Sequence, residues 1–181
     1  MTKLIPFIIT AIIGCGTGNQ DSRKEEGQQK TEIVQQSMLL GEFKKSDLMQ
    51  EPYSTWFKPG YDQYQPKEKA METIKEHIDQ YDIKIFMGTW CGDSKRETPR
   101  FFKILEEANY DMNNLTAIAV DYSKSTPKKY EEEVNLERVP TIIFYKNDQE
   151  VNRFVEYAQE SLEEDIAKIV SGEEYQNSYA Q

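Results

Sequence analysis

The sequence predicts an α/β domain in which helices flank a central mixed sheet. Apolar runs typical of buried strands alternate with segments whose apolar residues recur at helical spacing, and the order ends with two strands joined by a short turn. A chain of 181 residues is long enough for one such domain, while 38% apolar content and a net charge of −10 indicate polar segments around it.

The first half of the domain alternates helix and strand. Residues 83–88 form an apolar run that predicts a strand, and residues 94–108 predict the helix that follows. Residues 115–120 are almost continuously apolar, as in a strand covered on both faces. Before these elements, helical spacing predicts a first helix from Met71, Ile74, Ile78 and Tyr81.

The second half contains a predicted helix and a hairpin. Thr126 and Pro127 suit the N-cap and first turn of a helix that runs through Val134. Residues 141–145 and 151–155 then predict two strands of a hairpin.

A capping box predicts the last helix. Ser161-Leu162-Glu163-Glu164 has the serine and glutamate spacing that satisfies the first amides of a helix, and Gly172 suits its end. The domain is therefore expected over residues 66–172, with a polar tail at 173–181.

An extension precedes the domain. Residues 37–65 predict a short strand and a helical turn followed by an aromatic-rich loop. We expect the rings of this loop to pack onto the core; a platform lining a substrate groove is the alternative. The rings belong to Tyr53, Trp56, Phe57, Tyr61 and Tyr64.

The N-terminus predicts secretion and lipid attachment. Lys3 precedes an apolar run that is too short to span a bilayer, so residues 1–14 are expected to be a cleaved signal peptide. Ile12-Ile13-Gly14-Cys15 resembles a bacterial lipobox, which implies a lipid-modified Cys15 in the cell envelope, facing outside the cytoplasm. The alternative is an ordinary small residue in a short anchor or secretion signal. Residues 15–36 are expected to be a flexible tether, because they contain almost no apolar residues.

The turn Trp90-Cys91-Gly92 is the strongest candidate site. It joins the predicted strand to the predicted helix, and a sulfur at a helix N-terminus is stabilised as a nucleophilic thiolate. Ser94 stands three residues further on, and Cys15 is the other cysteine of the chain, so the chemistry starts from one sulfur. The alternative for Cys91 is a buried, inert cysteine.

Two motifs resemble the thioredoxin family over about residues 66–170. Trp90-Cys91-Gly92 matches the start of the family's active site, with Pro99 at the position of its helix kink, and Val139-Pro140-Thr141 matches the segment that contains a cis proline in the family. The resemblance implies a thioredoxin-like fold and thiol–disulfide exchange. It departs from the family at Ser94, which replaces the resolving cysteine, and at Ile85, where many thioredoxins bury an aspartate.

The resemblance also implies how a substrate binds. The backbone of Val139 would pair with an extended substrate beside Pro140, while Trp90 and Gly92 flank the sulfur. A plain core turn is the alternative role of Pro140. Glu156 and Tyr157, just after the hairpin, would lie near the same groove. Ser94 would donate a hydrogen bond to the thiolate of Cys91, and both are expected to be catalytic.

Two functions remain open at this point. One is a membrane-tethered monothiol oxidoreductase whose partners are protein or small-molecule disulfides and an external thiol reductant. The other is a binding module of the same fold without redox turnover. No cofactor and no metal site is expected, because the sequence lacks a Cys and His cluster. Nucleic acid is disfavoured as a partner by the acidic charge.

Overall fold

A computed structural model describes residues 38–180 and contains one five-stranded mixed sheet with the strand order β1-β3-β2-β4-β5. Strands β2 and β3 are parallel, while the β1/β3, β2/β4 and β4/β5 pairs are antiparallel. This confirms the predicted mixed sheet. The strands are β1 (Gly41–Glu42), β2 (Asp82–Met87), β3 (Leu115–Ala119), β4 (Thr141–Lys146) and β5 (Gln149–Val155).

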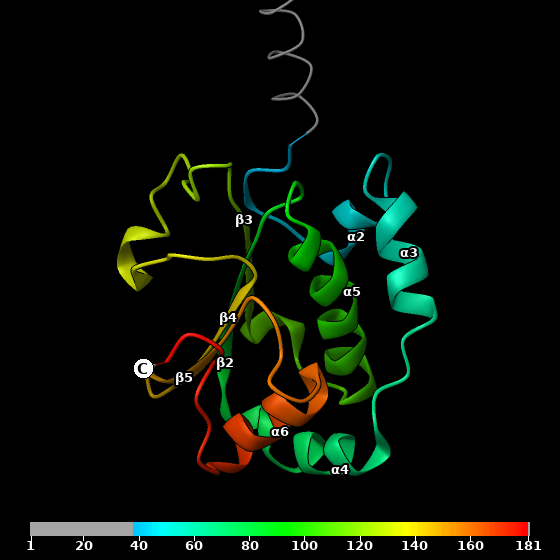
Figure 1. Cartoon of the computed structure of the whole chain (residues 1–181), viewed down its shortest axis with the longest axis vertical. Coiled ribbons are helices and arrows are strands. Elements are labelled where there is room, and N and C mark those ends of the chain that lie inside the picture. The colour runs from blue at the N-terminus through cyan, green and yellow to red at the C-terminus, as the bar shows by residue number, and fades with distance from the viewer. Residues whose placement is uncertain (1–37, 181) are drawn as a thin grey trace, which may run out of the picture. The chain divides into compact units, whose positions relative to one another are not determined.

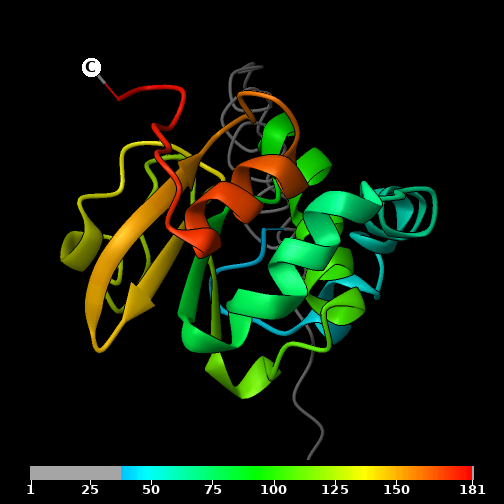
Figure 2. The same cartoon turned by 90° about the horizontal axis from the view of Figure 1, so that it is seen from below.

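Helices cover one face of the sheet, where the larger core lies (Figures 1 and 2). Within the described residues none of them is long and apolar enough to cross a membrane. The helices are α2 (Lys45–Leu48), α3 (Ser54–Asp62), α4 (Glu68–His77), α5 (Gly92–Glu107) and α6 (Leu162–Ser171).

The alternation along β2 separates two cores. Ile83, Ile85 and Met87 are buried in the larger core beneath the helices, whereas Phe86 belongs to a smaller cluster on the opposite face. Because successive side chains of a strand point to opposite faces, a continuous apolar run requires cover on both. The smaller cluster includes Val139, so it lies directly behind the predicted site.

The prediction of a helix from Thr126 through Val134 is wrong. Thr126 caps only one turn, since its hydroxyl oxygen accepts a hydrogen bond from the Tyr130 amide at 3.0 Å. Lys129 then adopts a φ of +59°, which is left-handed and incompatible with a continuing α-helix. A short 3-10 helix, Glu132–Val134, is the regular element that forms in this segment.

The predicted aromatic loop is also wrong in part, because α3 occupies its centre. The expected packing of its rings is confirmed: Phe57 is fully buried and contacts Phe102 of α5 at a ring distance of 5.9 Å. Pro59 and Gly60 suggest a turn in the sequence, but both lie inside α3. A Cβ on Gly60 would lie 2.9 Å from Pro99, so the glycine allows α3 to approach α5 closely.

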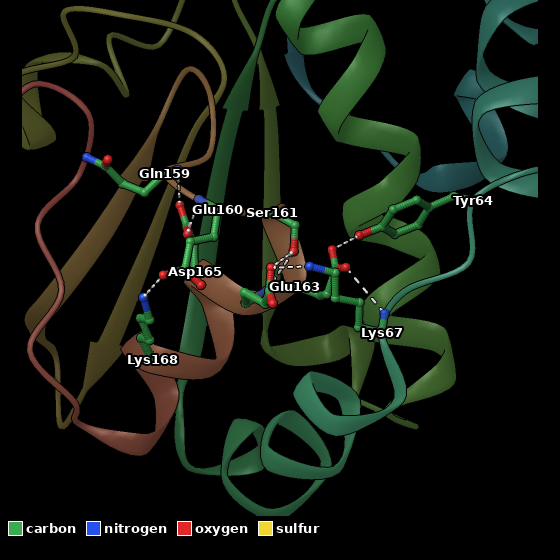
Figure 3. A network of polar contacts seen from close by, with 9 residues as sticks. Tyr64, Lys67, Gln159, Glu160, Ser161, Glu163, Asp165 and Lys168 are labelled. Carbon is green, nitrogen blue, oxygen red and sulfur yellow. Dashed lines mark hydrogen bonds and ion pairs between the residues drawn. The ribbon is translucent and has the colours of Figure 1, made fainter.

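The start of α6 is tied to the segment before α4 by a polar network (Figure 3). The buried carboxylate of Glu163 accepts hydrogen bonds from the Tyr64 hydroxyl and the Lys67 amide. Ser161 caps the helix as predicted, accepting from the Glu164 amide. Burial raises the pKa of Asp165, which accepts a hydrogen bond from the Gln159 amide at 2.8 Å.

The first helix is shorter than predicted. α4 ends at His77, and a 3-10 turn, Ile78–Gln80, carries the chain toward β2. The apolar residues predicted for one face are all buried, including Tyr81 after the turn, so the spacing indicated burial correctly.

Candidate active site at the start of helix α5

Cys91 occupies the N-cap of α5. The chain leaves β2 at Met87 and turns so that the Cys91 amide donates to the Gly88 carbonyl at 3.0 Å. The backbone of Cys91 is extended, with φ −83° and ψ 130°, and its carbonyl accepts the Lys95 amide at 3.0 Å. The side chain of Cys91 is therefore at the positive end of the helix dipole, and the residue is half-buried rather than enclosed.

The fold brings the two sequence motifs together. Cys91 Sγ lies 3.2 Å from the carbonyl oxygen of Val139, to which the thiol donates. The Val139-Pro140 peptide bond is cis, and both residues are buried. Because the Val139 side chain faces the core, the segment presents its backbone to the sulfur.

Ser94 lies in the core, one turn into α5, with no exposed surface. Its hydroxyl oxygen accepts a hydrogen bond from the Gly88 amide at 3.1 Å, a partner different from the expected thiolate. Through this hydrogen bond, Ser94 stabilises the position of the turn after β2 against α5, the helix with Cys91 at its N-cap. Ile85 is also completely buried, so apolar packing occupies the strand position where many thioredoxins have an aspartate.

Trp90 forms one wall beside the sulfur. Its indole Nε1 donates to the Val120 carbonyl at 3.0 Å, and its ring lies 5.0 Å from that of Tyr122. Gly88 makes this arrangement possible, since a Cβ at that position would lie 2.6 Å from the indole. Gly88 was not among the predicted site residues. A glycine at the end of the predicted strand, just before the Trp-Cys turn, could have indicated such a close approach.

Gly92 opens the other side. It is exposed at the first position of α5, and a Cβ there would meet open space. Its small size therefore leaves the approach to Cys91 unobstructed.

Arg96, in the first turns of α5, is paired with neighbouring carboxylates. Arg96 pairs with Asp93 at 2.7 Å and with the buried Glu97 at 2.5 Å. The guanidinium charge of Arg96 is thus divided between two carboxylates. The helix N-terminus adds a fixed source of positive potential at the sulfur.

A cavity of about 510 Å³ adjoins Cys91. Its wall includes the Trp90 and Tyr122 rings and the Val139 backbone segment, so all lie around one opening. Charged residues of both signs complete the lining: Lys124, Glu137, Arg138 and Glu156. Of the two residues expected near the groove, Glu156 belongs to this wall and Tyr157 does not.

A larger cavity of about 1040 Å³ lies between β1, α2, α5 and β3, away from the sulfur. Among the described residues there is no cluster of three or more side chains suited to hold a metal ion. Cys91 is the one free cysteine in this part of the chain, and Cys15 lies outside it.

Comparison with known proteins agrees with this geometry. The family model described as thioredoxin matches residues 44–169. The chain is 31% identical over 86 residues to a thioredoxin from Coprinus comatus, an alignment that covers 48% of this chain and 77% of that protein. The chain belongs to the thioredoxin family. This confirms the resemblance seen in the sequence, and it supports a thiol–disulfide oxidoreductase type of function for this thioredoxin-family protein.

Two solved structures are also similar to this chain, at lower sequence identity. The thioredoxin of Fasciola hepatica is 21% identical, with a TM-score of 0.33 and coverage of 46% of this chain and 75% of that one. A protein of unknown function from Pseudomonas aeruginosa, PA1234, is 13% identical, with a TM-score of 0.48 and coverage of 66% and 81%.

Proposed function

We propose that this thioredoxin-family protein is a monothiol thiol–disulfide oxidoreductase that is attached to a membrane through Cys15 and acts outside the cytoplasm. One observation carries the monothiol mechanism. The half-buried sulfur of Cys91 borders an open cavity, whereas the position one turn further holds the buried hydroxyl of Ser94.

The reaction takes place in two exchanges. The Cys91 thiolate attacks one sulfur of a substrate disulfide, the new Sγ–S bond forms, and the other substrate sulfur leaves as a thiolate that takes up a proton from water. Ser94 has no sulfur with which to attack the mixed disulfide. A second thiol, supplied by an external reductant, attacks the substrate sulfur as its thiolate. A disulfide forms between reductant and substrate, the bond between the substrate sulfur and Cys91 Sγ breaks, and Cys91 leaves as a thiolate.

The Val139 backbone supports the docking step of this proposal. Its carbonyl lies 3.2 Å from Cys91 Sγ, so an extended substrate that pairs with this segment brings its own sulfur next to the nucleophile. Trp90 limits the approach from one side, and the exposed Gly92 leaves the other side open.

Alkylation of Cys91 tests the proposal against a binding module without turnover. In the full-length Cys15→Ser variant, Cys91 is the remaining thiol. We expect iodoacetamide at pH 6.5 to modify the folded protein at least about tenfold faster than the same protein in guanidinium chloride, because the helix N-terminus directs its backbone amides and its positive potential at the attacking sulfur. Equal rates in the two states would favour the binding module and contradict catalysis by Cys91.

A further inference from the structure

The C-terminal tail is bound along the domain. The buried Tyr175 donates its hydroxyl to Asp165 at 3.1 Å, and its carbonyl accepts from the Asn152 side chain at 3.1 Å. Further along, the Ser178 hydroxyl donates to the Tyr157 carbonyl at 2.7 Å. Through these contacts, the tail runs from the end of α6 across β5 to the loop that follows this strand.

Tyr179 completes a cluster at the end of this path. Its hydroxyl donates to the Glu156 carboxylate, and its ring lies 3.8 Å from the Arg138 guanidinium carbon. Arg138 in turn pairs with Glu156 through one nitrogen at 3.4 Å. Arg138, Glu156 and Tyr179 are called the rim cluster below, and the Tyr157 ring supports it at 5.8 Å from Tyr179.

The rim cluster belongs to the wall of the cavity next to Cys91. Arg138 and Glu156 both line this cavity. Arg138 directly precedes Val139, whose carbonyl faces the sulfur, and the Glu156 amide donates to the Pro140 carbonyl at 2.7 Å. A substrate held on this backbone segment therefore passes within reach of the rim cluster.

The two charged residues of the rim cluster differ in how many of their hydrogen-bonding groups are already paired within the protein. Glu156 receives both the Tyr179 hydroxyl and the Arg138 guanidinium. Arg138 offers five N–H donors, and among the described residues it pairs with one carboxylate. The guanidinium carbon lies over the Tyr179 ring, and the N–H groups that are not paired with Glu156 remain for a second carboxylate.

We propose that the Arg138 guanidinium selects disulfides that carry a carboxylate near the attacked sulfur, and that Tyr179 is a positioning residue for Arg138. This rests on the proposed function, since Cys91 must first be reactive. The half-buried Lys124 on the same cavity adds a second cation. Contact with Tyr179 restricts the rotamers of Arg138, which lowers the entropy lost when it binds a carboxylate.

Two small disulfides of different charge test this selection. Full-length protein with Cys15→Ser reacts through Cys91 with either the dicarboxylate 5,5′-dithiobis(2-nitrobenzoate) or the neutral 2,2′-dithiodipyridine. Both reactions form a mixed disulfide on Cys91 and release a coloured thiol. The ratio of the acidic to the neutral rate constant is the readout, because a structural loss at the sulfur changes both rates.

We expect Arg138→Gln to lower this ratio about threefold to fivefold and Glu156→Gln to raise it by a similar factor. Tyr179→Ala should lower it as well, while Tyr179→Phe, which keeps the ring, should retain most of the ratio. Lys75→Gln and Glu76→Gln, exposed on α4 at the opposite end of α5, are controls that change net charge by the same amounts.

The outcomes separate the two proposals. A ratio in Arg138→Gln that matches Lys75→Gln overturns selection by Arg138, even if the neutral disulfide reacts normally. Equal ratios for Tyr179→Ala and the parent Cys15→Ser protein overturn the positioning role. Failure of Cys91 to react with the neutral disulfide in the parent Cys15→Ser protein overturns the proposed function, and the selection with it.

Discussion

Ser94 decides how far the chemistry of Cys91 can proceed within one molecule. A cysteine at this buried position would be able to attack a mixed disulfide on Cys91, whereas a hydroxyl is not a competent nucleophile toward a disulfide. The hydroxyl instead holds the Gly88 amide. Ile85 is consistent with this arrangement, since a buried carboxylate would be costly where there is no thiol for it to deprotonate.

Glu106 provides a residue-level prediction about pH. It accepts hydrogen bonds from Lys45 and, at 2.5 Å, from the Tyr61 hydroxyl. These bonds lower the pKa of Glu106 below its ordinary value of 4.5. Because the folded-state pKa is the lower one, the stabilisation is fully present above the unfolded-state value and is lost as the pH falls through the folded-state value.

Glu106→Gln should therefore reduce the free energy of unfolding near neutral pH by less than about 1 kcal/mol, since the carboxylate is exposed. The difference from the unsubstituted protein should shrink as the pH falls below 4.5 and through the folded-state pKa of Glu106. Urea denaturation at several pH values measures it, with Glu72→Gln, exposed on α4, as the control for loss of one charge. A difference that grows as the pH falls would contradict the assigned direction.

At the scale of elements, sequence patterns predicted β2, α5, the hairpin and α6, because each combines periodic apolar residues with a local start or stop signal. The elements that were missed depend on tertiary contacts or backbone conformations that the apolar periodicity does not indicate. Pro59 and Gly60 suggested a turn, but packing of Phe57 against α5 stabilises a helix there. Thr126 signalled a helix start, but the left-handed Lys129 ends the turn at once.

In the candidate site, too, local motifs were predicted and contacts between distant residues were missed. Cys91, Trp90 and the Val139-Pro140 segment were predicted because they form local motifs that the family resemblance related to one another. The rim cluster was not predicted as a unit: Arg138, Glu156 and Tyr179 are far apart in sequence, and a polar tail gave no sign that it would bind beside the site. Only the path of the tail over β5 brings Tyr179 there.

For the molecule as a whole, the proposal of membrane attachment depends on the sequence alone. A surface of net charge −10 offers little attraction to anionic headgroups, so an acyl anchor rather than basic residues would hold the protein at a membrane. Cys15 lies outside the described residues.

In a bacterial host, Cys15→Ser should therefore leave the membrane fraction or retain its signal and migrate as a larger species. Fractionation with immunoblotting measures both effects. Cys91→Ser is the control, since it removes a cysteine that should not affect attachment. If Cys15→Ser fractionates and migrates like the unsubstituted protein, the lipid anchor is excluded.

The fate of a mixed disulfide on Cys91 distinguishes the monothiol mechanism from resolution within one molecule. Full-length Cys15→Ser and the same protein with Ser94→Cys are each mixed with one equivalent of a peptide disulfide, without added thiol, and followed by intact mass spectrometry. The monothiol mechanism predicts a stable peptide adduct on Cys91 in the first protein. In the second, it predicts rapid loss of the adduct, with an internal disulfide formed between Cys91 and the thiol introduced by Ser94→Cys. Release of the peptide at equal rates from both proteins would contradict the mechanism.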